Sequence, residues 1–565
     1  MVGQSLQRAA VLTCPLWGWV FTVSAFGQST SGIEQRGFAA QVAAAGQTAQ
    51  PGPAQPVRRL SLDEAVKQAL EQNLSIQVER LNPQIQDMTI AQASAFWAPN
   101  SFASVTNNNQ SAPPDSLFSG ATGTVTSNQA RTQLGVRQGF QKTGGDVQVS
   151  WNTSRLTTNN IFNSFDPTLR SFVEVQFNQP LLQNYRIDQG RQQLLVTRKN
   201  RELSDIQFRQ TVANTVRSVK NAYWDLVFAY SNLEAQQQSL ELARRTLKDN
   251  RTRVEVGTMA PIDIVEAEAE VARNEESVIV AEAQIKSAED RLRALIFDPA
   301  APDFWNLTLE PTDKPNPSPV AVDVDGALRA ALDKRTDLQS AKKSLERNDI
   351  TLRYLRNQTL PQVNFNVTYN TEGLGGTELV RAATFPPGPV LGEVNRGLGS
   401  ILGDVFRSKY PDWIVGFNVS YPIGRSAAEA GVARAKLEYS QVQTQIRSIE
   451  LQVGTQIRDL GRQVNTNLKR VEATRAARQL SEKRLEAEQK KFSVGLSTSF
   501  QVFQAQRDLG QARNNEIRAI LDYNKSLVDF EAVQETNISG SGIVVGSSSA
   551  STGTASSTTG QQQQQ

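Results

Sequence analysis

The sequence contains no histidine and only one cysteine, Cys14, in 565 residues. Histidine is the commonest general base and the commonest metal ligand, so its absence removes the usual means of acid–base catalysis and of metal binding. One cysteine cannot form a disulfide framework or a thiolate metal cluster. The carboxylates are scattered along expected helices and do not converge with a nucleophile and an oxyanion site. We therefore expect neither an enzyme nor a bound cofactor.

Long apolar runs are also missing after the amino-terminal segment. Residues 1–27 combine Arg8, an apolar run and a small-residue pattern ending at Ala25, which is typical of an export signal peptide. A noncleaved membrane anchor is the alternative, but Pro15 and Gly18 interrupt a run that is already short for spanning. No later segment approaches the ~18 consecutive apolar residues of a transmembrane helix. If the mature chain spans a membrane, it must do so with strands.

Neither sign of charge is in large excess, because the chain has 59 Lys and Arg residues and 56 Asp and Glu residues. These charges are dispersed, and no basic cluster interleaved with aromatic residues appears. Nucleic acid is therefore an unexpected partner.

Proline is absent from residues 181–260, where Gly190 and Gly257 are the only glycines. A helix over 186–256 would be roughly 100 Å long at an α-helical rise of ~1.5 Å per residue. A globule of this chain length has a radius of gyration of only about 24 Å. The sequence therefore predicts an elongated protein.

Apolar residues recur along this segment at alternating spacings of four and three, which predicts a coiled-coil seam facing a partner helix. The seam consists of Val212, Val216, Val219, Tyr223, Leu226, Tyr230 and Leu233. A lone amphipathic core helix is the alternative, but such helices are usually much shorter.

The sequence contains an internal repeat, in which one structural unit occurs twice. Leu62-Asp63 corresponds to Val324-Asp325, and Pro99 to Pro361, at a spacing of 262 residues. The residues that end at Gly257 correspond to those that end at Gly495, at a spacing of 238. Each unit is expected to hold a moderate helix, β-strands, a very long helix, a tight turn and a return helix. Chance similarity of helical sequences is the alternative.

This duplication predicts the domain organisation. The expected segments are a signal peptide (1–27), a disordered leader (28–59), a first repeat (60–298), a linker (299–321), a second repeat (322–535) and a disordered, uncharged tail (536–565). Within the first repeat we expect strands over 100–180, a long helix over 186–256 and a return helix over 261–297. Within the second repeat the same elements are expected over 362–422, 424–494 and 498–535.

Apolar and polar residues alternate strictly in the strand segments, which gives each strand one apolar and one polar face. The apolar sets are Val173, Val175 and Phe177; Val363, Phe365, Val367 and Tyr369; and Trp413, Val415, Phe417, Val419 and Tyr421. A soluble half-buried sheet would give the same alternation. The strand lengths and the aromatic residues toward the strand ends favour a bilayer. We expect polar surface loops at 107–129 and 370–408.

Two strands per repeat give four per chain, whereas small closed barrels need about eight. Unpaired backbone groups are costly in hydrocarbon, so several chains must contribute strands to one barrel. An extra apparent hairpin, 132–140 and 146–151, surrounds Thr143-Gly144-Gly145. The sequence leaves open whether this hairpin crosses the membrane.

Each long helix is expected to end in a tight turn, called a tip, which contains Gly257 in the first repeat and Gly495 in the second. Gly257 and Gly495 are suited to the left-handed conformation that often ends a helix. Pro261 suits the first turn of the following helix, and Thr498 with Gln501 resembles a capping box. A structural turn explains both glycines by itself, and contact with a partner protein is a compatible second interpretation.

These motifs, in this order and duplicated, resemble the outer membrane efflux protein family, whose type member is the TolC channel-tunnel. The resemblance covers 60–533 and is carried by Leu60-Ser61-Leu62-Asp63-Glu64-Ala65, by Pro99 and Pro361 before strands, by Gln179-Pro180-Leu181-Leu182 and by both tips. It implies an α+β membrane protein in which each chain of a homotrimer lends four strands to a twelve-stranded β-barrel above an α-helical tunnel. It also implies contact with outer membrane lipid, with a periplasmic adaptor protein and with an inner-membrane transporter.

The resemblance also implies candidate site residues at the tips. The turn and adaptor contact would comprise Val256, Gly257, Thr258, Val494, Gly495 and Leu496. The family's acidic rings fall on Gln501 and Gln504, and its locking tyrosine and arginine fall on Phe492 and Ser497. The equivalent positions after the first tip, Asp263 and Glu266, are acidic; solvated acids near a helix amino terminus are the alternative interpretation.

The expected function is a passive outer membrane channel-tunnel for efflux or type I secretion, extending into the periplasm. The alternative is a periplasmic coiled-coil scaffold or adhesin without a pore, whose sheets pack as a soluble domain. Alternating strands flanked by aromatic residues favour the channel.

Overall fold

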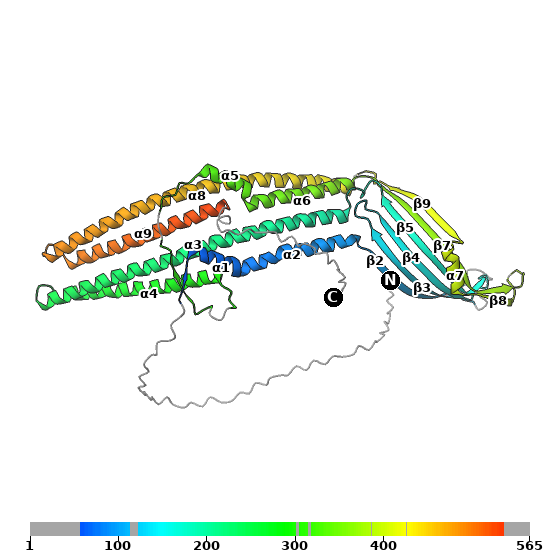
Figure 1. Cartoon of the computed structure of the whole chain (residues 1–565), viewed down its shortest axis with the longest axis horizontal. Coiled ribbons are helices and arrows are strands. Elements are labelled where there is room, and N and C mark those ends of the chain that lie inside the picture. Colours follow the sequence, from blue (N-terminus) through cyan, green and yellow to red (C-terminus); the bar gives the residue numbers. More distant parts are fainter. Residues whose placement is uncertain are drawn as a thin grey trace, which may run out of the picture. The chain divides into compact units, whose positions relative to one another are not determined.

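The structure, a computed structural model, describes residues 57–113, 123–300, 304–314, 318–385, 387–424 and 426–535 (Figure 1). The chain divides into two units, Met1–Ala54 and Gln55–Gln565, and every described residue lies in the second. The expected signal peptide, most of the leader, part of the linker and the tail lie outside the described residues.

The first half of this unit holds two short helices, four long strands and a long helical hairpin. In chain order its elements are β1 (Val57–Leu60), α1 (Leu62–Gln72), α2 (Leu74–Ser94), the 3-10 turn η1 (Ala95–Trp97), β2 (Asn100–Ala112), β3 (Val125–Gly139), β4 (Asp146–Thr158), β5 (Phe165–Pro180), α3 (Gln189–Glu255) and α4 (Ile262–Ile296).

The second half repeats the helices but not the strands. Its elements are β6 (Thr308–Pro311), α5 (Val324–Lys334), α6 (Thr336–Gln358), β7 (Gln362–Arg381), β8 (Val390–Arg396), α7 (Leu398–Phe406), β9 (Pro411–Ser420), α8 (Ala427–Ser493) and α9 (Ser499–Val533). Both ends of α5 follow those of α1 by 262 residues, and both ends of α8 follow those of α3 by 238. The first half therefore holds 24 more residues between these helices.

The helices α3 and α8 each run for 67 residues without proline. Asp188 caps α3 by accepting a hydrogen bond from the backbone N–H of Arg191 at 2.7 Å, and Ser426 caps α8 through Glu429 at 3.1 Å. Such caps satisfy amide groups that have no partner inside the helix. Each long helix packs against the return helix that follows it, and α3 also contacts α2, α6 and α9 (Figure 1).

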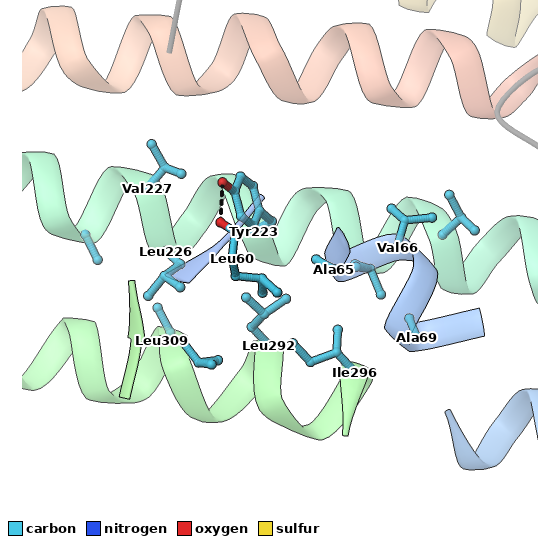
Figure 2. Packing of buried hydrophobic residues seen from close by; sticks show 14 of the residues in the cluster. Leu60, Ala65, Val66, Ala69, Tyr223, Leu226, Val227, Leu292, Ile296 and Leu309 are labelled. Carbon is cyan, nitrogen blue, oxygen red and sulfur yellow. Dashed lines mark hydrogen bonds between the residues drawn. The ribbon is translucent and has the colours of Figure 1, made fainter. Parts of the chain in front are cut away.

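The largest core cluster buries the apolar seam of α3 against α1, α4 and a two-stranded parallel sheet formed by β1 and β6. Tyr223 is fully buried there, and its hydroxyl donates to the carbonyl oxygen of Leu60 at 3.1 Å (Figure 2). Figure 2 shows Leu226, Leu292 and Leu309 closing around the same point. The expectation that the leader extends to residue 59 is wrong at its end, because this pairing orders Val57–Leu60 as a strand.

The remaining strands form one antiparallel sheet in the order β2-β3-β4-β5-β7-β8, and β9 pairs with β7 as well. Because β5 takes one edge of β7, β8 and β9 lie along the other edge, β9 beside its first half and β8 beside its second. Within the described residues β2 pairs only with β3, and β8 and β9 pair only with β7. The sheet is therefore open at both sides.

The strand pairing brings apolar side chains onto one face. One row across the sheet runs through Val136, Val149, Val175, Tyr369 and Trp413. Four of these positions stay solvent-exposed within the chain, with exposed fractions from 37% for Tyr369 to 70% for Trp413, and Val175 is half-buried. A soluble monomer rarely leaves so long an apolar surface uncovered.

The opposite face of the same strands is polar. The row that includes Gly135 runs through Ser150, Glu174, Asn370 and Asp412. Ion pairs cross between strands on this face, including Arg170 to Glu372 at 3.1 Å.

Two loop predictions need correction. The loop expected at 107–129 is largely strand, since β2 and β3 pair as far as Ala112 and Val125. The loop expected at 370–408 contains the end of β7, all of β8 and α7. The sequence predicts loops at these positions because the residues are Asn-, Thr- and Gly-rich, so cross-strand pairing rather than apolar alternation orders them. No helix in the described part of the chain is long and apolar enough to cross a bilayer.

Four charged side chains connect α3 to α6. Lys199 contacts Glu202 at 2.8 Å and Glu346 at 2.9 Å, and Lys343 contacts the same two carboxylates at 2.9 and 3.2 Å. The hydrogen bond from Lys199 is the main cause that lowers the pKa of Glu346 below its ordinary value. Burial raises the pKa of Glu202, but the hydrogen bonds from both lysines outweigh it and lower the pKa overall.

We expect the double substitution Glu202→Gln and Glu346→Gln to lower the free energy of unfolding at neutral pH by about 0.5–1 kcal/mol, the usual range for solvent-screened pairs. A lowered folded-state pKa stabilises the protein above the unfolded-state value of about 4.3 and loses that effect as the pH falls through the folded-state pKa. The difference from wild type should therefore vanish in acid. Thermal unfolding followed by circular dichroism at pH 7 and pH 3 measures it.

Glu438→Gln is the matched control, because Glu438 pairs with Arg434 on the exposed surface of α8 alone. It should change stability little at either pH. A double variant as stable as wild type at pH 7 would contradict a stabilising role for the network.

Candidate functional site

The turn between α3 and α4 is a Schellman motif. Gly257 has a φ of 77°, its N–H donates to the carbonyl of Val254 at 2.9 Å, and the N–H of Thr258 donates to the carbonyl of Arg253 at 2.9 Å. Only a left-handed residue closes a helix in this way, and glycine adopts that conformation without a Cβ penalty.

The turn between α8 and α9 repeats this geometry at a spacing of 238 residues. Gly495 has a φ of 80°, its N–H donates to the carbonyl of Phe492 at 3.1 Å, and the N–H of Leu496 donates to the carbonyl of Lys491 at 2.8 Å. The two helix ends predicted as tips are therefore the same backbone device.

The starts of the two return helices differ from each other. Pro261 stands immediately before α4, at a φ of −58° that suits a helix start. The capping box expected from Thr498 and Gln501 does not form, because the side chain of Thr498 makes no cap hydrogen bond. The side chain of Gln501 instead accepts a hydrogen bond from the hydroxyl of Ser497 at 3.2 Å.

Apolar side chains at the tips point into solvent. Val256 and Val494 are each 68% exposed, and Leu496 is 79% exposed. Ile262 and Phe500, which begin the return helices, are also largely exposed. Both tips thus carry apolar surface that the chain itself does not cover.

Two contacts join the first tip to the second. The guanidinium of Arg253 lies 4.6 Å from the centre of the Phe492 ring and donates to the Phe492 carbonyl oxygen at 3.5 Å. The hydroxyl of Ser499 donates to Asp263 Oδ1 at 2.5 Å. One contact is a cation–π interaction and the other a charge-assisted hydrogen bond, so each fixes the helical hairpin of one repeat against that of the other.

A third connection lies farther from the turns. Arg507 on α9 contacts the buried carboxylate of Glu270 on α4 at 3.3 Å. The same arginine donates to the side-chain oxygen of Gln504 at 2.9 Å, and the side-chain nitrogen of Gln504 donates to Asp508 at 2.9 Å. Gln504 is thus held between an arginine and an aspartate.

The predicted gate residues therefore have different surroundings. Asp263 and Phe492 contact the other repeat, whereas Glu266 lies on an exposed face of α4. Ser497 contacts its own repeat by donating to Glu488 at 2.9 Å. Hydrogen bonds from Lys491 and then from Ser497 lower the pKa of Glu488.

Sequence reasoning missed Arg253, Ser499, Glu270 and Arg507. Arg253 stands four residues before the first tip glycine, but its position in the sequence does not identify the aromatic ring that its guanidinium contacts. Its partner Phe492 is 239 positions away, so only the packing of the two hairpins identifies the pair. Among the described residues no cluster of His, Cys, Asp and Glu is arranged to hold a metal ion.

Comparison with known proteins gives one family and several solved structures. The sequence profile described as "Outer membrane efflux protein" matches residues 145–296 and 327–533, which is more than half of the chain. No curated protein matches the chain in sequence.

The solved structures are similar in fold. The CmeC outer membrane channel of Campylobacter jejuni aligns with a TM-score of 0.60 at 13% identity, covering 85% of this chain and 89% of that one. VceC of Vibrio cholerae aligns with a TM-score of 0.58 at 15% identity over 84% and 96% of the two chains. The open state of the MtrE channel of Neisseria gonorrhoeae aligns at 0.55 with 16% identity over 84% and 88%.

The tip geometry predicts that Gly257→Ala and Gly495→Ala destabilise the turns. A Cβ at either position would meet no atom within 4 Å, so the cost is conformational alone. Forcing alanine into the left-handed region costs roughly 1–2 kcal/mol. Hydrogen exchange at the amides of Thr258 and Leu496, which close the two motifs, should accelerate about tenfold.

Gly257→Asn and Gly495→Asn are the matched controls, because asparagine tolerates the left-handed conformation better than alanine does. They should exchange at rates close to wild type. Equal protection in the alanine and asparagine variants would show that the backbone conformation of the tips is not the constraint.

Proposed function

The chain belongs to the outer membrane efflux protein family, and on that premise we propose that it is the passive channel-tunnel of a tripartite efflux or type I secretion system. As a member of this family it lies in the outer membrane, acts in transport and is not an enzyme.

The apolar face of an open sheet is the single observation that carries the proposal. The row from Val136 to Trp413 matches the outward face of a membrane strand, and the row from Gly135 to Asp412 matches a water-filled interior. The strand ends nearest the helices are joined by the short turn 140–145, whereas the opposite end of the sheet carries the longer connection 113–124 and, between β7 and β9, the elements β8 and α7. Outer membrane strands have this same asymmetry of short periplasmic turns and long outer loops.

We infer that the open sides of the sheet are closed by further copies of the chain. The free edge of β2 would pair with β9 of a neighbouring copy, and three copies would form one barrel continuous with a helical tunnel. Closure satisfies backbone groups that hydrocarbon would leave unpaired.

The tips supply a surface for the periplasmic partners. Val256, Val494 and Leu496 would contact a periplasmic adaptor that links the tunnel to an inner-membrane transporter. Their exposure supports this assignment, since apolar side chains clustered on a surface mark interaction sites. The transporter would provide the energy, and the channel itself would be passive.

The contacts between the two tips supply a gate. Opening would separate the α3–α4 hairpin from the α8–α9 hairpin and would break the contacts from Arg253 to Phe492 and from Asp263 to Ser499. Asp263 and Glu266 would then face the widened passage. Gln501 and Gln504 at the equivalent positions of the second repeat are neutral, so the acidic character comes from one repeat alone.

The proposal is tested by purifying the protein from outer membranes and adding it to planar lipid bilayers. We expect extraction to require detergent and the bilayer current to rise in uniform steps. A protein that leaves the membrane fraction without detergent and produces no steps would instead support the periplasmic scaffold or adhesin.

Removing the contact between the tips should open the channel. The variant Arg253→Ala loses a cation–π interaction worth about 0.5–1 kcal/mol. This loss would raise the open fraction about two- to fivefold. Bilayer recordings measure the open fraction, and entry into cells of an antibiotic too large for porins provides a second readout.

Arg251→Ala is the control, because Arg251 pairs with Glu268 at 2.7 Å within the first hairpin and not across the two tips. Its open fraction should equal that of wild type. Equal effects of the two substitutions would refute a gate held by Arg253.

A further inference from the structure

The hairpin β3–β4 is inserted into the middle of the sheet. It lies between β2 and β5, paired with β2 from Asn100↔Arg137 to Ala112↔Val125 and with β5 from Asp146↔Asn178 to Leu156↔Thr168. Without it, β2 and β5 would be adjacent antiparallel strands. The first repeat thus contributes four strands to the sheet. In the second repeat, β7 and β9 are the strands that adjoin the helices.

The hairpin continues both faces of the sheet without a break. Val136 and Val149 lie in the apolar row beside Val175, and the next apolar row runs through Leu134, Trp151 and Val173. On the other face, Arg137, Gln148 and Gln176 form one polar row. Strands that are one residue out of register would reverse these faces, so the pairing fits a single continuous bilayer-facing surface.

The turn of the hairpin is held at the helical end of the sheet. Arg191 near the start of α3 donates to the carbonyl of Lys142 at 3.0 Å, and the side chain of Gln179 donates to the carbonyl of Thr143 at 2.9 Å. Gly144 takes a φ of 72° in this turn, where a Cβ would meet the carbonyl of Asn184 at 2.6 Å. The hairpin therefore starts and ends at the same levels as β2 and β5.

We propose that β3 and β4 are membrane-spanning strands, so that each copy contributes six strand positions rather than four to the barrel. The positions are β2, β3, β4, β5, β7 and the shared position of β8 and β9. In the trimer of the proposed function, on which this inference rests, the barrel has about eighteen strands instead of twelve. Its diameter is larger by about half, because barrel diameter grows roughly linearly with strand number.

The widened bore has a chemical character of its own. The hairpin residues that face the interior are polar: Arg131, Arg137 and Asp146 are charged, and Gln129, Gln133, Gln148, Ser150, Asn152 and Ser154 are neutral amides and hydroxyls. The outer part of the passage therefore admits bulky polar cargo wider than a four-strand contribution allows.

The first test locates the hairpin relative to lipid with nitroxide labels on single cysteines, in a background with Cys14→Ser. In proteoliposomes a label at Val149→Cys should collide with oxygen as often as a label at Val175→Cys, its neighbour in the apolar row. A label at Gln148→Cys should collide with a water-soluble nickel chelate instead. A label at position 149 that meets nickel chelate, or that neither reagent reaches, would show that lipid does not cover the hairpin.

The second test removes the hairpin by deleting residues 125–158, which joins Thr124 to Asn159. Because β2 and β5 are antiparallel and both present odd-numbered residues on the apolar face, they can pair directly in the shortened chain. The largest polyethylene glycol that enters the channel from the loop side should shrink in radius by about one third. An unchanged cut-off would overturn the wider barrel.

The two tests separate this inference from the proposed function. Uniform conductance steps with an unchanged cut-off contradict the wider barrel and leave the channel intact. Absence of steps from the wild-type protein contradicts the channel itself. If the shortened chain fails to assemble, the labels at positions 148 and 149 still decide the place of the hairpin.

Discussion

A sheet edge in hydrocarbon leaves backbone N–H and C=O groups without partners, and each such group costs several kcal/mol. The described sheet has two open edges, one along β2 and one along β8 and β9; α7 covers its apolar face beside Thr371, whereas Val136 and Trp413 on the same face stay exposed. These features suit a chain whose open sheet edges are covered by further copies of the same chain. In the proposed assembly the long helices would continue the wall of the passage from the strands to which they are joined.

Duplication explains why the two repeats have long helices of equal length and the same turn at the tips. The helices α3 and α8 have the same length, and both end in a Schellman turn with glycine in the left-handed conformation. The same backbone device presents different chemistry on each side, because Asp263 of one repeat corresponds to Gln501 of the other. The halves have diverged most in the sheet, where the first repeat carries the inserted hairpin.

The helices were the most predictable part of the fold. Absence of proline, a sustained heptad seam and glycines at the turns are local signals, and the structure has α3 at Gln189–Glu255, where the sequence predicts a helix over 186–256. The tip glycines were equally predictable, because a left-handed helix end favours glycine almost regardless of its surroundings. Three features could not be predicted from the sequence. The strand β1 is ordered only by its pairing with β6, and β2 and β3 extend through polar residues. The contact between Arg253 and Phe492 forms only when two distant hairpins pack together.

The number of copies in the particle that detergent extracts from the outer membrane tests the account most directly. Sedimentation equilibrium in a density-matched detergent measures it without reference to activity. The account predicts a stable assembly of three chains and no folded single chain. A stable single copy that stays in solution without detergent would contradict it, because the open edges and the apolar face would then need no partner.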